Sequence, residues 1–433
     1  MTFRSRLLAS DDTLRRHSKV SVLFLSLDGL LQPLGRSQIV AYVTGLARSG
    51  IAYTVISAES QSDLQDTALV EELRNELRES GVAWEPVEYS PGGALAAAQN
   101  LRRLGSRVTQ QVQQQQVQLI HARSYIAAGL ALACKARFGT PYIFDTRGYW
   151  PEEKRASGKW LSDPITFAIA KKLERRLFMG AAGVVGLTQL SIDDFNEGVF
   201  GKAHPRVPAV TIPTATNGET FVFDRSKTPP TAGANLRETL SDKLVIGYVG
   251  SVNASYHLGP SIELFKKVKS ARPDAHFLGI TGQAEVLSAA LAKAGVAKED
   301  FSVVKARYAD MPQWLSCIDW GLLLLSEERM KRASMPTKLA EFLATGVRPI
   351  QFGCNSEVGD WVERAGSGLR LADLNDATLE AAAQEIAMAS FDEAQLRQAR
   401  EIALAHFGLD VAIRNYAGLI ETILQHRAIL SLR

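Results

Sequence analysis

The 433-residue sequence has few cysteines, no strong excess of either charge and no long apolar run. Its three cysteines, Cys134, Cys317 and Cys354, stand far apart and form no CxxC pair. This spacing argues against a disulfide framework or a zinc knuckle and fits a reducing compartment. No stretch approaches the roughly 18 apolar residues that a membrane span needs. Because the N-terminal segment has no apolar core of a secretion signal, we expect a cytoplasmic protein.

Basic and acidic residues nearly balance, at 49 Lys and Arg against 46 Asp and Glu. The formal net charge of +3 is too weak an excess to indicate a nucleic-acid partner. The first 18 residues form a basic arm, with four arginines against two aspartates. This arm has two interpretations: a solvated tail, or a peripheral contact with anionic lipid on the inner face of the membrane.

Short β-branched runs alternate with longer amphipathic segments along most of the chain, as in βαβ units with parallel sheets. The alternation pauses at residues 224–243, a polar stretch with Pro229-Pro230 that we interpret as a linker. We therefore predict an α/β fold of two Rossmann-like parallel-sheet domains facing a cleft, over residues 19–223 and 244–409. Ligands bind such domains beyond the carboxyl ends of the strands.

The segment over residues 326–346 combines a helix start with well-spaced polar side chains. It follows a predicted strand and opens a helix, with Ser334 as the expected N-cap and Pro336 in the first turn. The free amides and the dipole of that helix end favour an anion. Lys338 and Glu341 are three residues apart and share one helix face. Such a pair suits a nucleotide-sugar diphosphate; a solvated ion pair is the alternative.

The stretch PTKLAEFLATGVRPI resembles the donor-site signature of retaining glycosyltransferases of family four, which have the GT-B fold. Four other stretches agree in order: LDGLLQPLGRSQIVAYVTGLARSG, IHARSYIAAGLA, FDTRGYWPEE and VIGYVGSVNASYHL. The resemblance spans about residues 20–371. It implies an enzyme that moves a hexose from a nucleotide-diphosphate sugar to a hydroxyl of a glycan or lipid-linked acceptor, with retention. The resemblance implies that no positioned nucleophile is needed, because the leaving diphosphate itself draws the proton from the acceptor. We expect no cofactor, and the lack of a DxD motif at a strand end predicts that no metal is needed.

The resemblance also assigns donor-site residues. In that family a glutamate matching Glu341 holds the ribose, and a second glutamate eight positions earlier contacts the sugar, where this chain has Ala333. The family's basic pair beyond the first strand of the second domain is missing after Gly250, so Lys331 or Lys338 is expected to supply that charge. The expected donor-binding residues are Gly35, Lys331, Ser334, Thr337, Lys338 and Glu341.

Gly35 lies in the loop after the first predicted strand. The resemblance implies a glycine whose backbone approaches the donor phosphates, and a turn-forming glycine is the alternative. Arg36 and Gln38 open the next helix, which we expect to run through Arg48. Both side chains are expected to face the cleft.

Two further groups of polar residues stand at predicted strand ends in the first domain. His121 and Arg123 project to the same side, and the resemblance implies that a histidine here contacts the donor sugar or the acceptor. We therefore expect His121 and Lys338 to be catalytic, with a packed histidine as the alternative. Aromatic rings and charges gather again in FDTRGYWPEE. The expected acceptor-binding residues are Arg123, Asp145, Arg147 and Tyr149; a structural Asp145–Arg147 pair is an equal alternative.

Other patterns bear on metals, on alternative functions and on the end of the chain. No DxD motif stands at a strand end, and Asp193-Asp194 is interpreted as solvated charge on a helix. Ala333 favours a catalytically degenerate GT-B binding or partner subunit, and a nucleotide-sugar epimerase is a further alternative.

Residues 410–433 have apolar positions at spacings of three and four. The resemblance implies that this last helix returns to the first domain.

Overall fold

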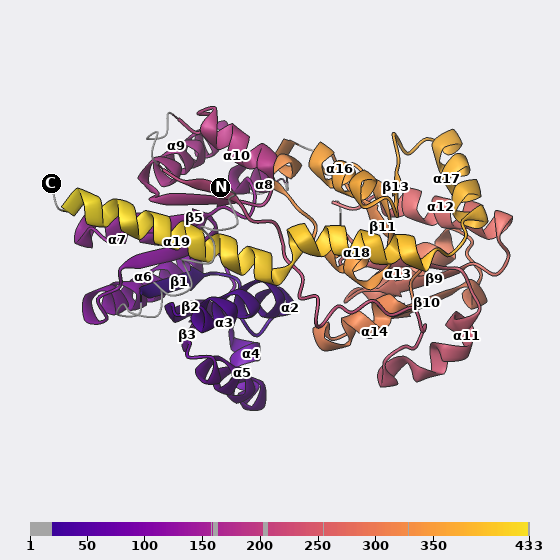
Figure 1. Cartoon of the computed structure of the whole chain (residues 1–433), viewed down its shortest axis with the longest axis horizontal. Helices are drawn as coiled ribbons and strands as arrows, with labels where there is room; N and C mark the ends of the chain where they lie inside the picture. The colour runs from indigo at the N-terminus through magenta and orange to yellow at the C-terminus, as the bar shows by residue number, and fades with distance from the viewer. Residues whose placement is uncertain are drawn as a thin grey trace, which may run out of the picture. The chain divides into compact units, whose positions relative to one another are not determined.

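The two halves of the chain fold as separate compact units (Figure 1). One unit takes the described residues through Ile212 together with those from Ala412 on, and the other is Pro213–Val411. The basic arm lies outside the described residues. The structure is a computed structural model that describes residues 20–156, 158, 163–201, 207–253, 255–327 and 329–431.

The first unit is built on a parallel sheet of seven strands in the order β3-β2-β1-β4-β5-β6-β7. The strands are Ser21–Ser26 (β1), Ala52–Ser60 (β2), Ala83–Tyr89 (β3), Leu119–Arg123 (β4), Tyr142–Asp145 (β5), Gly183–Gly186 (β6) and Ala209–Thr211 (β7). The order reverses between β1 and β4. In open parallel sheets this reversal opens a crevice at the carboxyl ends, where ligands bind.

Several helices of the first unit begin at side chains that accept hydrogen bonds from free amides. Asp66, Asp163 and Thr188 cap α5, α9 and α10 in this way, which is why the helices start where they do. The helices are Pro33–Gly35 (α2), the π-helical turn Arg36–Val40, Ala41–Arg48 (α3), Gln61–Gln65 (α4), Thr67–Glu79 (α5), Ala94–Gln114 (α6), Ser124–Phe138 (α7), Trp150–Ala156 (α8), Pro164–Gly180 (α9) and Gln189–Asn196 (α10).

The second unit has a parallel six-stranded sheet in the order β10-β9-β8-β11-β12-β13, which reverses between β8 and β11. The strands are Val245–Val249 (β8), His276–Ile280 (β9), Phe301–Val304 (β10), Trp320–Leu324 (β11), Arg348–Phe352 (β12) and Leu369–Arg370 (β13). The helices are Arg237–Ser241 (α11), Leu258–Ala271 (α12), Ala284–Lys293 (α13), Met311–Ser316 (α14), Thr337–Thr345 (α15), Ser356–Ala365 (α16), Asp376–Met388 (α17) and Glu393–Phe407 (α18). Buried apolar residues such as Phe265 and Phe277 form a core between this sheet and its helices.

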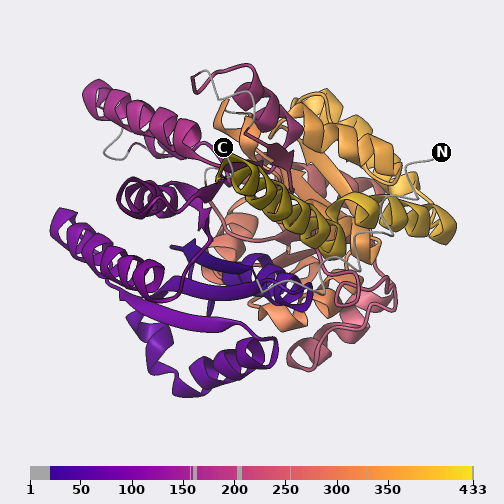
Figure 2. The ribbon, with the colours of Figure 1, turned by 60° about the vertical axis from the view of Figure 1, so that its left-hand side comes forward.

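The C-terminal helix α19, Leu409–Ser431, packs on the first unit from Ala412 onward (Figures 1 and 2). Ile413 lies so close to Gly45 that any β-carbon there would clash, and Ile423 does the same at Gly183. Glycines at these two positions therefore let the helix approach α3 and β6 closely.

The α/β architecture with two parallel sheets is confirmed, and two details differ from the sequence-based expectation. The predicted linker over residues 224–243 lies inside the second unit, where Arg225 and Lys227 both pair with Asp319. Strand β3 was not predicted, because Pro86 and two glutamates obscure its apolar alternation; an edge strand tolerates them. Within the described part of the chain, no helix is both long and apolar enough to cross a membrane.

Candidate active site

Helix α15 begins at the carboxyl edge of the second sheet, directly after β11 and beside the point where the strand order reverses. Its N-cap is Pro336 rather than the predicted Ser334, and no side chain caps it. Met335 precedes this proline, and a residue in that position disfavours helical geometry, so the helix cannot start earlier. The Leu339 amide donates to the Pro336 carbonyl at 3.1 Å, which leaves the amides of Thr337 and Lys338 for an anionic ligand.

Lys338 lies over the turn that ends strand β8. Gly250 takes a φ of +112° there, and a β-carbon on it would lie 2.5 Å from the Lys338 Nζ atom. The ammonium group is 4.0 Å from the centre of the Tyr256 ring, a favourable cation–π distance. No carboxylate among the described residues lies within ion-pair distance of Lys338, so the alternative of a Lys338–Glu341 ion pair is not realised. The charge of Lys338 is available to a ligand.

Glu341 is a buried carboxylate to which the described part of the chain offers no partner. Its side chain is 7% exposed, and none of the described residues donates a hydrogen bond to it. Burial raises the pKa of Glu341 to about 8, against the opposing effect of the Lys338 charge. Buried carboxylates are normally paired or hydrogen-bonded. A hydroxyl-bearing ligand would supply the missing donors.

Glu341→Gln is expected to remove a pH dependence of stability. Because the pKa is raised in the folded state, the native chain binds an extra proton between the unfolded pKa and about 8 and loses stability as the pH rises through that window. The native unfolding free energy should fall relative to Glu341→Gln by on the order of 1–3 kcal/mol between about pH 5.5 and about pH 8.5. Urea unfolding at both pH values measures this.

The matched control is Glu401→Gln, which changes an exposed glutamate of α18 in the same unit. Its pH dependence should follow that of the native chain. Parallel curves for the native chain and Glu341→Gln would contradict the raised pKa.

The other predicted donor residues surround the approach to α15. The carbonyl groups of Lys331 and Ser334 each accept a hydrogen bond of 2.7 Å from the Asn355 amide, which fixes the path of the chain. Thr337 is the first residue of the helix. Ala333 is fully buried, so this position offers no room for the family's sugar-contacting glutamate.

Sequence reasoning missed Ser326 and the ring of Tyr256. The Ser326 hydroxyl is buried and has no partner among the described residues. Ser326 follows strand β11, beside the point where the strand order of the sheet reverses. A polar residue directly after such a strand is the sequence signal that could have identified it. Of the two glutamates beside it, Glu327 is exposed and Glu328 lies outside the described residues.

Gly35 has a packing reason of its own. A β-carbon on Gly35 would lie 1.9 Å from the carbonyl oxygen of Gly29. The Gly29 loop is held by the buried Glu59 carboxylate, which accepts a 2.7 Å hydrogen bond from the Leu30 amide. The alternative of a structural glycine thus has direct support, and a contact with the donor phosphates stays a prediction.

Gly35→Ala is expected to destabilise the protein by about 1–3 kcal/mol, because the added methyl group overpacks two backbone segments. Gly129→Ala is the matched control, since a β-carbon on this α7 glycine meets nothing within 4 Å. The control should be neutral or gain about 0.5–1 kcal/mol from helix propensity. Urea unfolding compares the two; equal stabilities would contradict the close approach.

Asp145, at the end of β5, is the centre of a buried charge cluster in the first unit. Its carboxylate accepts a 2.9 Å hydrogen bond from the Tyr416 hydroxyl and lies 3.7 Å from Arg147 and 3.9 Å from Arg123. Burial alone would raise the pKa of Asp145, but Arg147, His121 and Arg123 hold it at about 2. The structural Asp145–Arg147 pair is therefore present.

His121 lies in the middle of β4 rather than at its end, and it is 1% exposed. Its ring packs between Phe24 and Tyr416, with centroid distances of 4.5 and 5.0 Å. Neither ring nitrogen has a hydrogen-bond partner among the described residues, and Nε2 is 3.6 Å from Asp145. Burial lowers the pKa of His121, which favours the neutral ring. These observations favour the packed histidine that we gave as the alternative.

Arg147 adopts a backbone conformation that non-glycine residues rarely take, with a φ of +59°. Its Nη2 atom lies 3.5 Å from Gln38 Oε1, and the Tyr42 hydroxyl also donates to that oxygen. Gln38 is fully buried in the π-helical turn, so it faces the interior of the unit and not a cleft. Arg36, from the same turn, pairs with Glu76 at 2.7 Å.

Tyr149 does not form an open wall for an acceptor. It is 4% exposed, its hydroxyl donates to Asp194 at 2.5 Å, and its ring packs edge-on against Phe200. The expectation that Asp194 is solvated is wrong as well, because this residue lies on the buried face of α10. Among the described residues, no group of three His, Cys, Asp or Glu side chains is placed to hold a metal ion.

Comparison with known proteins agrees with this architecture. Residues 36–213 match the family model described as the glycosyl transferase 4-like domain. A search of curated proteins found no significant match. The structure of HepE from Anabaena, solved in complex with UDP and glucose, has a TM-score of 0.66 at 14% identity, and the match covers 93% of this chain and 100% of that one.

Two other solved structures span nearly the same length. Sucrose-phosphate synthase from Thermosynechococcus elongatus has a TM-score of 0.69 at 12% identity, covering 94% of this chain and 100% of that one. A putative UDP-N-acetylglucosamine 2-epimerase from Listeria monocytogenes has a TM-score of 0.61 at 12% identity, covering 94% and 98%. The chain therefore has the GT-B fold, and its residues 36–213 match the glycosyl transferase 4-like domain, in agreement with the resemblance to glycosyltransferases of family four.

Proposed function

We propose that the protein is a retaining glycosyltransferase that moves a hexose from a nucleotide-diphosphate sugar to a hydroxyl of a glycan or lipid-linked acceptor. One observation carries this proposal: Glu341 is buried where the sheet order reverses, and among the described residues neither it nor the neighbouring Lys338 has a hydrogen-bond or ion-pair partner. The ligand that meets both needs has vicinal hydroxyls and a diphosphate.

In this proposal two side chains and the start of α15 bind the donor. Glu341 accepts hydrogen bonds from the ribose hydroxyls. Lys338 and the amides of Thr337 and Lys338 in the first helical turn hold the diphosphate, and the missing β-carbon of Gly250 leaves room for the Lys338 ammonium group. As the bond from the sugar C1 to the phosphate oxygen breaks, Lys338 stabilises the charge on the leaving diphosphate.

Transfer proceeds on one face of the sugar. The acceptor oxygen forms its bond to C1 on the side from which the diphosphate leaves, and the acceptor proton passes to a phosphate oxygen of the leaving group. The chain supplies positioning and charge stabilisation in this route.

Residues of the first unit are proposed to position the acceptor. Arg123 bonds Asp28 at 3.0 Å, and the Asp28 side chain is 44% exposed, which connects the buried cluster to the surface of this unit. Asp145 holds Arg123 and Arg147, and His121 acts through Asp145. The burial of these side chains supports a positioning role for them, and Tyr149 takes no part.

The test is whether free nucleoside diphosphate appears only when an acceptor is present. The full chain is incubated with UDP-, GDP- and ADP-sugars, with and without polyprenyl-phosphate-linked and free glycans, and the product anomer is read by NMR. Acceptor-dependent release with retained configuration supports the proposal. Conversion of the sugar without an acceptor would indicate an epimerase, and binding without turnover a binding subunit; either result would overturn it.

A further inference from the structure

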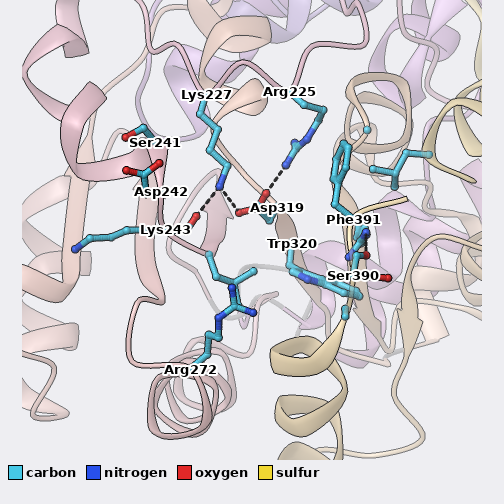
Figure 3. A pocket seen from close by; sticks show the side chains of 15 residues that line it. Arg225, Lys227, Ser241, Asp242, Lys243, Arg272, Asp319, Trp320, Ser390 and Phe391 are labelled. Carbon is cyan, nitrogen blue, oxygen red and sulfur yellow. Dashed lines mark hydrogen bonds and ion pairs between the residues drawn. The ribbon is translucent and has the colours of Figure 1, made fainter. Parts of the chain in front are cut away.

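A cavity in the second unit is lined by residues that include Arg225, Asp319 and Trp320 (Figure 3). Trp320 begins β11 and Arg348 begins β12, and both line the cavity, which places it at the amino ends of the strands. Its volume is about 400 Å³, within the range of small-molecule sites.

The lining carries more positive than negative charge. It includes two carboxylates, Asp242 and Asp319, and five cationic side chains: Arg225, Lys227, Lys243, Arg272 and Arg348.

Asp319 is already fully engaged. Arg225 Nη2 lies 2.5 Å from one of its oxygens, and Lys227 Nζ lies 2.8 Å from the other (Figure 3). The Val245 amide donates to the same carboxylate at 2.8 Å. One carboxylate thus serves two cations, so the cluster keeps a positive charge.

Arg348 is the unusual member of the lining. It is 8% exposed, and no carboxylate among the described residues lies within ion-pair distance of it. Its guanidinium lies 5.2 Å from the centre of the Trp320 ring, and Nη2 donates to the Ser390 carbonyl at 2.5 Å. Asp319 and Asp392 favour its charge only from beyond that distance. A buried cation without a directly paired carboxylate is rare in a folded protein.

Two donor groups of the lining also lack acceptors. Arg225 Nε and Trp320 Nε1 are buried and have no hydrogen-bond partner among the described residues. Both of these atoms can only donate, as can the guanidinium of Arg348. A ligand that suits this donor-rich, cationic lining is an acceptor that carries negative charge.

We propose that this cavity binds a small organic phosphate, at a site separate from the donor site. Arginine forks match phosphate oxygens in geometry and charge. The cavity is larger than a phosphate ion, and the Trp320 ring and the neighbouring Phe391 give the organic part an apolar surface. The proposal does not depend on the glycosyltransferase activity.

Calorimetry with the full chain at constant ionic strength tests the site, with inorganic phosphate and ribose 5-phosphate as probes. Both should bind saturably, the organic phosphate more tightly, and quenching of tryptophan fluorescence should disappear in Trp320→Phe. Arg348→Met keeps the stem over Trp320 and removes the charge, so it should weaken binding by about tenfold or more. Arg237→Met, which removes an exposed cation of the same unit, should leave binding unchanged.

Three results would overturn the proposal. The first is that neither probe binds saturably at concentrations up to about 10 mM. The second is unchanged affinity in Arg348→Met. The third is loss of binding in Lys338→Met with retention in Arg348→Met, which would place the phosphate at the donor site. If Arg348→Met does not fold, Trp320→Phe tests the site instead. This variant should lose the fluorescence response and bind the probes more weakly in calorimetry. If both measurements stay as in the native chain, the proposed site is wrong.

Discussion

Asp145→Asn is expected to destabilise the protein by about 3–5 kcal/mol, the cost of removing one partner from a buried charge cluster. The substitution keeps the shape of the side chain but leaves Arg147 and Arg123 without their shared counter-charge. Arg123 has a second carboxylate in Asp28, whereas Arg147 has none within ion-pair distance among the described residues other than Asp145. Urea unfolding of the native chain and the variant near neutral pH measures the loss.

The same carboxylate predicts a distinct acid limb of stability. Its folded pKa of about 2 lies below the unfolded value, so its contribution is complete above the unfolded pKa and is lost as the pH falls toward 2. Asp145→Asn should lack this limb. Tyr416→Phe removes the 2.9 Å hydrogen bond alone and should cost about 1.5–3 kcal/mol, less than the loss of the charge. A loss below about 1 kcal/mol in Asp145→Asn would show that the cluster is not a unit.

Glu341→Ala is expected to weaken the binding of nucleoside diphosphate by about one to two decades. Loss of a hydrogen bond to a charged group costs on the order of 1.5–3 kcal/mol, which is about tenfold to a hundredfold in affinity. Lys338→Met should have an effect of similar size, because it removes the unpaired cation at the start of α15. Calorimetry with UDP, GDP and ADP measures both variants.

Glu401→Gln is the control for that series. It changes an exposed glutamate of the same unit, so it should bind nucleoside diphosphate as the native chain does. Unchanged affinity in a folded Glu341→Ala variant would remove Glu341 from the donor site.

The alternation of apolar runs sufficed to predict two α/β halves with parallel sheets, because strand and helix periods are local properties of the chain. Elements whose local pattern of apolar residues is weak were not predicted. Strand β3 owes its pairing to the neighbouring β2 rather than to its own composition. The π-helical turn over Arg36–Val40 has the same apolar spacing as an ordinary helix, so its effect on Gln38 was not foreseen.

For the donor site, spacing placed Lys338 and Glu341 on one helix face, and the chain order placed that helix after a central strand. Spacing does not reveal that the two side chains leave each other unpaired. That outcome follows from the turn at Gly250 and the ring of Tyr256, which lie far away in sequence and occupy the space around Lys338.

The sequence by itself determined the fold class, the helix that carries Lys338 and Glu341, and the resemblance to family-four glycosyltransferases. Tertiary structure decided which polar groups are buried and which find partners. It turned His121 and Tyr149 inward and joined Asp145 to Tyr416 of the last helix. It also left Arg348 with no carboxylate of the described residues within ion-pair distance. The physical reason is that burial and pairing depend on segments that only folding brings together, and no local pattern of residues encodes the free-energy cost of an unpaired group.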